Sequence, residues 1–220
     1  DVLRTAGWFD KYSVESVVAP ELKPLEGRRL TDVANERRCT LLEAFLDLSL
    51  ADKLQITFLT DARGDDPDSW RLRKDLWNDK RTIIGASDAG AHLDMNSVFT
   101  YFTDLLGPGV RDRQLLSLEE AVYRLTDQPA RFNGLEDRGR LAPGYHADVV
   151  IFDPETIRPA EVTMRPDMPG GEPRIYAEAV GIDLVMVNGV DVVIDGRPTG
   201  ATPGTLLRSG RDTVDEVYNP

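Results

Sequence analysis

The sequence is poor in the residues that form disulfides and bind transition metals. Among its 220 residues there are one cysteine, Cys39, and two histidines, His92 and His146. A single cysteine cannot form an internal disulfide, which favours a reducing compartment, so we expect a cytoplasmic protein. Cys39 lies beside the apolar pair Leu41 and Leu42, so we interpret it as a small packed hydrophobe and not as a nucleophile.

The chain also lacks a long apolar run and an excess of positive charge. No segment approaches the roughly 18 consecutive apolar residues that span a bilayer, and no signal-peptide pattern follows Asp1. The net charge of −12 disfavours nucleic acid and anionic membranes, so we expect neither as a partner. The sequence contains no phosphate loop, no dinucleotide fingerprint and no Cys-x-x-Cys pair.

Residues 1–135 have the pattern of an α/β protein. Short apolar or β-branched runs predict strands at residues 14–19, 55–59 and 82–88. Helical spacing and capping signals predict helices at residues 31–38, 40–50, 69–78, 96–106, 117–125 and 126–132. Turn-forming residues predict loops at residues 21–27 and 61–68. The Gly-Pro-Gly sequence at 107–109 is expected to end the preceding helix.

Near residue 136 the pattern changes from helical to β. Alternating and β-branched runs predict strands at residues 147–152, 184–187 and 190–194. The Asn188-Gly189 dipeptide between the last two runs predicts a β-hairpin. We therefore predict an α/β part at residues 1–135 and a small β part at residues 136–220, including a polar tail.

The run TIIGASDAGAH at residues 82–92 carries the most chemical information. An apolar segment ends in a turn of small residues that presents Asp88, and His92 follows four residues later. A parallel barrel offers a catalytic acid or a metal ligand in this way, at the C-terminal end of a strand. Asp88 is therefore the candidate catalytic residue. Ser87 lacks the Gly-x-Ser-x-Gly surroundings of a nucleophile, and we interpret it as a turn hydroxyl.

Three further runs accompany this segment: LTDQPARFNGL at residues 125–135, GRLAPGYHADVVIFDP at 139–154, and the closing VNG and DGRPTG sequences at 187–189 and 195–200. Together they resemble the C-terminal portion of the amidohydrolase superfamily. The SDAGAH and closing runs are similar to the N-acyl-D-amino-acid deacylase (D-aminoacylase) branch. The resemblance covers residues 26 to 208.

The resemblance implies an α/β fold: the C-terminal part of a metal-dependent (β/α)8 TIM barrel, followed by the C-terminal strands of a small β-sandwich. It implies a hydrolase that cleaves an N-acyl-D-amino acid with metal-activated water, using one or two zinc ions. Asp88 matches the family's aspartate at the end of the last barrel strand, which implies a metal ligand and proton shuttle. Ser87, His92 and Arg28 are candidates for contacts to the substrate or to the groups around Asp88.

The chain lacks the other metal ligands of that family. The His-x-His pair, the bridging Cys or Lys and the later histidines are absent, which leaves His92 and His146. A full barrel needs ~250 residues, and one βα unit with its loops uses roughly 30, so residues 1–87 can hold two or three strands. We expect a C-terminal piece whose partner, the N-terminal part of the same enzyme or a companion subunit, supplies the metal-binding histidines.

Residues 21–50 are predicted to be an insertion over the active site. They are rich in turn residues, carry short capped helices and lie between two predicted strands. Such additions on the C-terminal face of a barrel act as lids. Arg28 or Arg29, near the entrance, would then be placed to meet a substrate carboxylate, although a surface salt bridge is the favoured role for either one.

Two alternatives to the deacylase interpretation stay open. The first is a cyclic-amide hydrolase related to hydantoinases or dihydroorotases, against which the SDAGAH run argues. The second is a non-catalytic scaffold subunit that keeps the fold without the metal-binding half. A companion chain with a His-x-His pair and two later histidines would exclude the scaffold.

Overall fold

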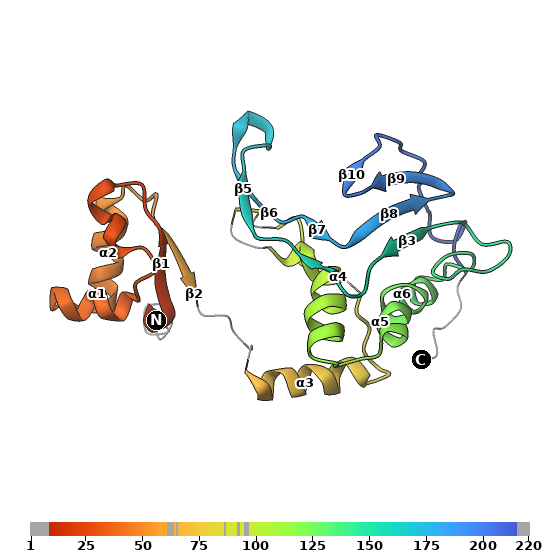
Figure 1. The fold of residues 1–220 in the computed structure, drawn as a ribbon, viewed down its shortest axis with the longest axis horizontal. Helices are drawn as coiled ribbons and strands as arrows, with labels where there is room; N and C mark the ends of the chain where they lie inside the picture. The colour runs from red at the N-terminus through yellow and green to blue at the C-terminus, as the bar shows by residue number, and fades with distance from the viewer. Residues whose placement is uncertain are drawn as a thin grey trace. The chain divides into compact units, whose positions relative to one another are not determined.

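The computed structural model describes residues 9–60, 64, 66–85, 87–91, 93–94 and 97–214. The chain divides into two compact units, Asp1–Arg71 and Leu72–Pro220 (Figure 1). Helix α3, Pro67–Asn78, contains the point of division. The predicted boundary near residue 136 is of a different kind, because it separates the barrel part from the β part of the complete enzyme. It stays a prediction.

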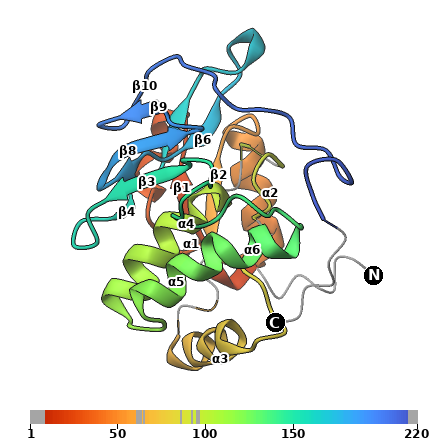
Figure 2. The ribbon, with the colours of Figure 1, turned by 90° about the vertical axis from the view of Figure 1, so that its right-hand side faces the viewer.

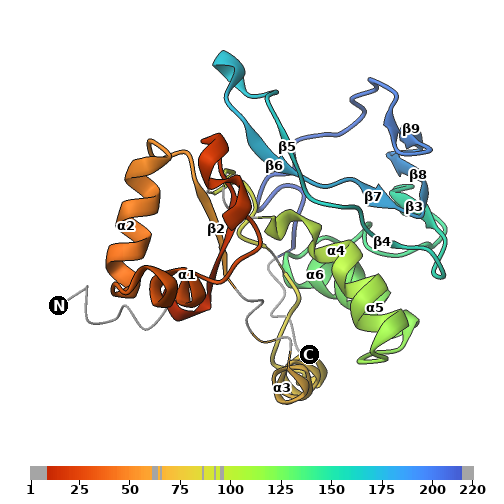
Figure 3. The same ribbon diagram turned by 60° about the vertical axis from the view of Figure 1, so that its left-hand side comes forward.

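The first unit combines an antiparallel strand pair with two helices. Its elements are β1 Tyr12–Ser16, α1 Leu30–Arg37, α2 Leu41–Ala51, β2 Thr57–Thr60 and the 3₁₀ helices Phe9–Lys11 and Pro20–Leu25. In the β1–β2 pair, Val14 lies opposite Phe58. Figures 1 and 3 both show α1 and α2 on one side of this pair. The segment predicted as a loop at residues 21–27 is thus largely a 3₁₀ helix.

Local capping chemistry fixes the start of α2. The Thr40 hydroxyl accepts the backbone N–H of Glu43 at 3.2 Å, and the Glu43 carboxylate accepts the N–H of Thr40 at 2.8 Å. This confirms the predicted capping box. Helix α1, predicted at residues 31–38, begins one residue earlier, at Leu30. A β-bridge with Ser13 holds Arg29 in an extended conformation, and this residue becomes the cap.

The core of this unit is apolar and continuous. Its largest fully buried side chains are Val14, Leu30, Val33 and Leu48, with Phe9, Tyr12, Phe45 and Phe58 packed around them. Cys39 is half-buried against this core, and its thiol lies 3.8 Å from the carbonyl oxygen of Ala34. This placement agrees with its interpretation as a packed side chain.

The second unit places helices before a set of short strands. Its helices are α4 Tyr101–Asp104, a π-helix at Leu105–Asp112, α5 Leu118–Leu125 and α6 Asp127–Phe132, with 3₁₀ helices at Val98–Thr100 and Pro169–Gly171. Its strands are β3 Val149–Phe152, β4 Arg158–Pro159, β5 Thr163–Arg165, β6 Arg174–Tyr176, β7 Ala179–Val180, β8 Ile182–Val187, β9 Val190–Ile194 and β10 Arg197–Pro198. The main sheet has the order β10-β9-β8-β3, and Figure 2 shows β8 between β3 and β9.

The predicted hairpin at Asn188-Gly189 is confirmed. Both residues have positive φ, 48° and 79°, as a two-residue type I′ turn requires. Val187 pairs with Val190 directly across this turn. The hairpin connects β8 to β9 and fixes the register of the sheet.

The prediction that Gly107-Pro108-Gly109 ends a helix is wrong, because the π-helix continues to Asp112. A β-carbon on Gly107 would lie well inside van der Waals contact with the carbonyl oxygen of Ile157. Ile157 and Leu105 belong to the same buried cluster. Gly107 therefore allows a close backbone approach and does not act as a stop signal.

The prediction of a strand at residues 82–88 is also wrong for the described residues of this segment. Residues 82–85 and 87–88 have no strand pairing. Every strand pair among the described residues is antiparallel. A parallel strand needs a neighbour that supplies its hydrogen bonds, and the described part of the chain offers none to residues 82–85.

Candidate functional site

Asp88 lies on an exposed turn in the second unit. The Ser87 hydroxyl accepts the N–H of Ala89 at 3.2 Å, and the Asp88 carbonyl oxygen lies 3.4 Å from the nitrogen of Ala91. Ser87 thus serves as the turn hydroxyl that the sequence predicted. Among the described residues, the Asp88 carboxylate makes no hydrogen bond or ion pair, and the residue is exposed.

The loop that carries Asp88 is held on both sides. On one side Ile84 packs against the buried cluster of the second unit. On the other, the carbonyl oxygen of Leu93 accepts the N–H of Ile175, in β6, at 2.7 Å. In the sequence, Asp88 lies between these two points of attachment.

Small residues leave space beside Asp88. Gly90 has a φ of +94°, and a β-carbon there would meet no atom within 4 Å. The neighbouring Ala89 and Ala91 are exposed. Within the described residues, this side of the loop is open to a substrate or ion.

The structure brings together only part of the predicted site. Ser87 and Asp88 share the turn, and His92 lies outside the described residues. Arg28 lies in the first unit, where it donates to the Glu36 carboxylate at 2.7 Å. This ion pair is the favoured role predicted for Arg28, and a contact between Arg28 and a substrate stays a prediction.

His146 and Asp148 have structural surroundings, as their turn position suggests. Asp148 accepts the N–H of Asn188 at 2.8 Å and forms an ion pair with Arg138. Partial burial raises the pKa of the Asp148 carboxyl, but the Asn188 N–H and the Arg138 charge outweigh it, so the pKa lies below its usual value. Nε2 of His146 lies 3.3 Å from the carboxylate of Asp137.

A complete metal site is not formed by the described residues alone. They contain no group of three histidine, cysteine, aspartate or glutamate side chains that could hold an ion. Structural and catalytic zinc sites use at least three protein ligands. Asp88 can contribute one oxygen, and the remaining ligands must come from elsewhere. Within the described part of the chain, no helix combines the length and apolarity that a membrane span requires.

Residues 24–199 match the amidohydrolase family. The chain belongs to this family. Over 107 residues it is 42% identical to N-acyl-D-glutamate deacylase of Alcaligenes xylosoxydans xylosoxydans. The aligned region covers 49% of this chain and 20% of the deacylase. Over 185 residues it is 32% identical to D-aminoacylase of the same organism, covering 83% of the chain and 34% of the relative.

A solved D-aminoacylase structure supports the same assignment. It superposes with a TM-score of 0.50 and 30% identity, over 86% of this chain and 36% of the D-aminoacylase chain. The resemblance to the deacylase branch is therefore confirmed. This amidohydrolase chain spans only one-fifth to about one-third of the length of these relatives.

The sequence did not indicate which residues elsewhere in the chain contact the segment that carries Asp88. Ile175 lies in a three-residue strand, too short for a clear alternation signal. Gln128 is almost fully buried, and its amide lies 3.4 Å from the carbonyl oxygen of Thr82. Its position within a short predicted helix gave no indication of this contact.

Proposed function

We propose that this chain is the C-terminal part of an enzyme that hydrolyses the linear amide of N-acyl-D-amino acids. The observation that carries the proposal is Asp88, a carboxylate without a partner among the described residues, on a loop attached at Ile84 and Leu93. The similarity to N-acyl-D-glutamate deacylase and D-aminoacylase supplies the substrate class.

In this proposal Asp88 moves the proton of the reaction. The carboxylate takes a proton from the water that attacks the amide carbon, and returns it to the nitrogen as the carbon–nitrogen bond breaks. A divalent metal, proposed to be one or two zinc ions, would polarise the amide and acidify the water. D-aminoacylase has a binuclear metal centre, which supports this expectation. The histidine ligands would lie outside this chain.

We also propose the architecture of the complete enzyme. Residues 82–85 would become the last strand of a (β/α)8 barrel once a neighbouring strand, from the N-terminal part or a companion subunit, supplies hydrogen bonds. The β3-β8-β9-β10 sheet would form part of a β-sandwich. Residues 21–50 would then cover the C-terminal face of the barrel, where active sites lie.

Hydrolysis assays on the assembled protein test the proposal. N-acetyl-D-glutamate, N-acetyl-D-methionine and their L-enantiomers would be compared with hydantoin and dihydroorotate. We expect release of the free D-amino acid, with the L-forms and cyclic amides turned over more slowly. Preferred cleavage of a cyclic amide would contradict the proposal. So would no turnover of any substrate by a preparation in which native mass spectrometry finds the histidine-bearing companion.

A further inference from the structure

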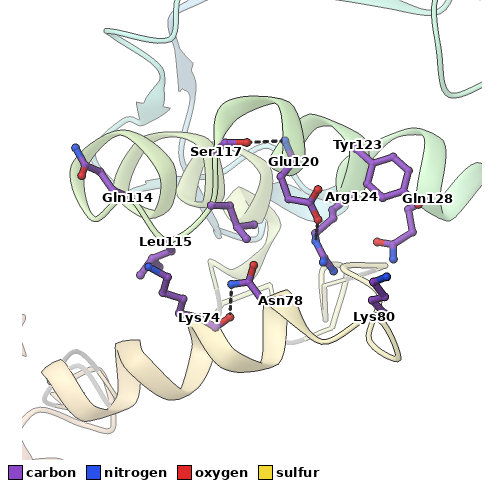
Figure 4. Close-up of a pocket in the computed structure, with 11 residues that line it drawn as sticks. Lys74, Asn78, Lys80, Gln114, Leu115, Ser117, Glu120, Tyr123, Arg124 and Gln128 are labelled. Atoms are coloured by element: carbon purple, nitrogen blue, oxygen red, sulfur yellow. Dashed lines mark hydrogen bonds and ion pairs between the residues drawn. The ribbon is translucent and has the colours of Figure 1, made fainter. Parts of the chain in front are cut away.

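A pocket of about 760 Å³ lies in the second unit. It is lined by the C-terminal part of α3, the turn that follows it, the segment at residues 114–117, and residues of α5 and α6. Figure 4 shows Arg124 extending from α5 into this space, with Lys80 and Gln128 on the same side of the pocket. A volume of this size is typical of sites for small molecules.

Two side chains of the pocket contain buried polar atoms without partners. Nη1 of Arg124 and Oε1 of Gln128 form no hydrogen bond among the described residues, although the residues are only 5% and 2% exposed. Nη1 of Arg124 carries hydrogen-bond donors, and Oε1 of Gln128 is an acceptor. A buried polar group without a partner is costly, so these atoms favour partners that the described residues do not supply, an acceptor for Arg124 and a donor for Gln128.

The charge of the pocket favours an anion. Lys74, Lys80 and Arg124 line it, together with one carboxylate, Glu120. Glu120 neutralises only one of the three cations, because it is paired with Nε of Arg124 at 2.6 Å. The local balance is therefore positive in a chain whose net charge is −12. Such a reversal concentrates anions at the pocket.

We propose that this pocket binds a small oxyanion that also carries a hydroxyl proton, such as hydrogenphosphate or a phosphate monoester in its singly protonated form. Arg124 donates through Nη1 to an anionic oxygen, and the O–H of the ligand donates to Oε1 of Gln128. Lys80 contributes its charge at the same side of the pocket.

The proposed site is distinct from the turn that carries Asp88. The Gln128 amide reaches the carbonyl oxygen of Thr82, six residues before Asp88 in the sequence. The residues that line the pocket do not include Ser87 or Asp88. The inference therefore does not depend on the proposed hydrolysis.

Calorimetric titration of the protein in its native assembly tests the site, with phosphate and sulfate as probes at constant ionic strength and neutral pH. Sulfate carries no proton at this pH, so it can pair with Arg124 but cannot donate to Gln128. We expect phosphate to bind at least about tenfold more tightly, the effect of one hydrogen bond to a buried acceptor. The titration is repeated after chelation of metals, and binding that disappears with the metal would overturn the proposal.

Variants assign the binding to this pocket. Lys80→Gln removes one charge from an exposed position and should weaken phosphate binding several-fold, whereas Lys53→Gln, an exposed lysine in the first unit, should leave it unchanged. Arg124→Lys keeps a cation for Glu120 but loses Nη1, and should weaken binding about tenfold or more. Equal affinities of Lys80→Gln and the unmodified protein, equal binding of sulfate and phosphate, or no binding at all would each overturn the proposal. If Arg124→Lys does not fold, the phosphate affinity of Lys80→Gln still tests whether the anion binds at this pocket.

Discussion

Individual side chains in this protein gain their roles from what surrounds them. Asp88 and Asp148 are both aspartates that lie close to turns. Asp148 is tied to the Asn188 N–H and to Arg138, whereas the Asp88 carboxylate has no partner among the described residues. The contacts of Asp148 therefore stabilise the fold, as its turn position suggested, whereas the catalytic role of Asp88 stays a prediction.

The lowered pKa of Asp148 makes its contribution to stability dependent on pH. A carboxyl with a lower pKa in the folded state stabilises the protein above its unfolded-state pKa, and this contribution is lost as the pH falls through the folded-state value. Asp148→Asn should therefore lower the free energy of unfolding at pH 7 by about 1–2 kcal/mol.

Chemical denaturation at pH 7 and at about pH 3 measures this effect. The difference between the unmodified protein and Asp148→Asn should shrink at the lower pH. Asp195→Asn, at an exposed turn residue that tolerates asparagine at positive φ, is the matched control and should differ little. A difference between Asp148→Asn and the unmodified protein that does not change with pH would contradict the assignment.

Elements specified by local sequence could be predicted, and those specified by distant contacts could not. The start of α2 follows from Thr40 and Glu43, and the β8–β9 hairpin follows from Asn188-Gly189. The predicted strand at residues 82–88 failed because strand formation needs a partner. The predicted helix end at Gly107 failed because Ile157, fifty residues later, decides what that glycine does.

Replacement of Gly107 tests this packing. Alanine favours a helix by about 1 kcal/mol over glycine when nothing obstructs it. At Gly107 the added methyl group meets the Ile157 carbonyl, and overpacking of this kind costs about 1–3 kcal/mol. Because the obstacle is backbone, we expect Gly107→Ala to lower the free energy of unfolding despite the gain in helix propensity.

Thermal and urea denaturation measure the change. Gly204→Ala is the control, because a β-carbon there meets no atom within 4 Å. It should leave stability unchanged or raise it slightly through the unfolded state. If Gly107→Ala is as stable as Gly204→Ala, the close approach does not constrain the helix.

At the scale of the whole molecule, the chain belongs to the amidohydrolase family and spans about one-third or less of the D-aminoacylase and deacylase relatives' length. The described strands form one four-stranded sheet and three two-stranded pairs, and β3 lies at an open edge of the larger sheet. Val150 and Ile151 on this strand are each 51% exposed. Apolar side chains on an unpaired edge favour association with another chain. The proposed metal-binding histidines would come from the same partner, which stays a prediction.

We therefore predict that the chain expressed alone exposes apolar surface. It should bind the dye ANS and associate in analytical ultracentrifugation, and both signals should fall when the N-terminal part or companion subunit is added. Replacement of Val150 and Ile151 by threonine, which keeps β-branched side chains, should reduce dye binding without that partner. A monomeric chain with a cooperative melt and no dye binding would contradict the prediction.

The role of Asp88 is tested most directly by the kcat of Asp88→Asn in the assembled enzyme, with metal content measured on the same sample. Asparagine keeps the shape of the side chain but cannot accept and return a proton. We predict an unchanged circular dichroism spectrum, a metal still held by the histidines, and a kcat lowered by about 10²–10⁴-fold, the usual contribution of a positioned acid–base group. A kcat close to that of the unmodified enzyme, with the metal present, would contradict the proton-transfer role and the interpretation of this chain as part of the catalytic site.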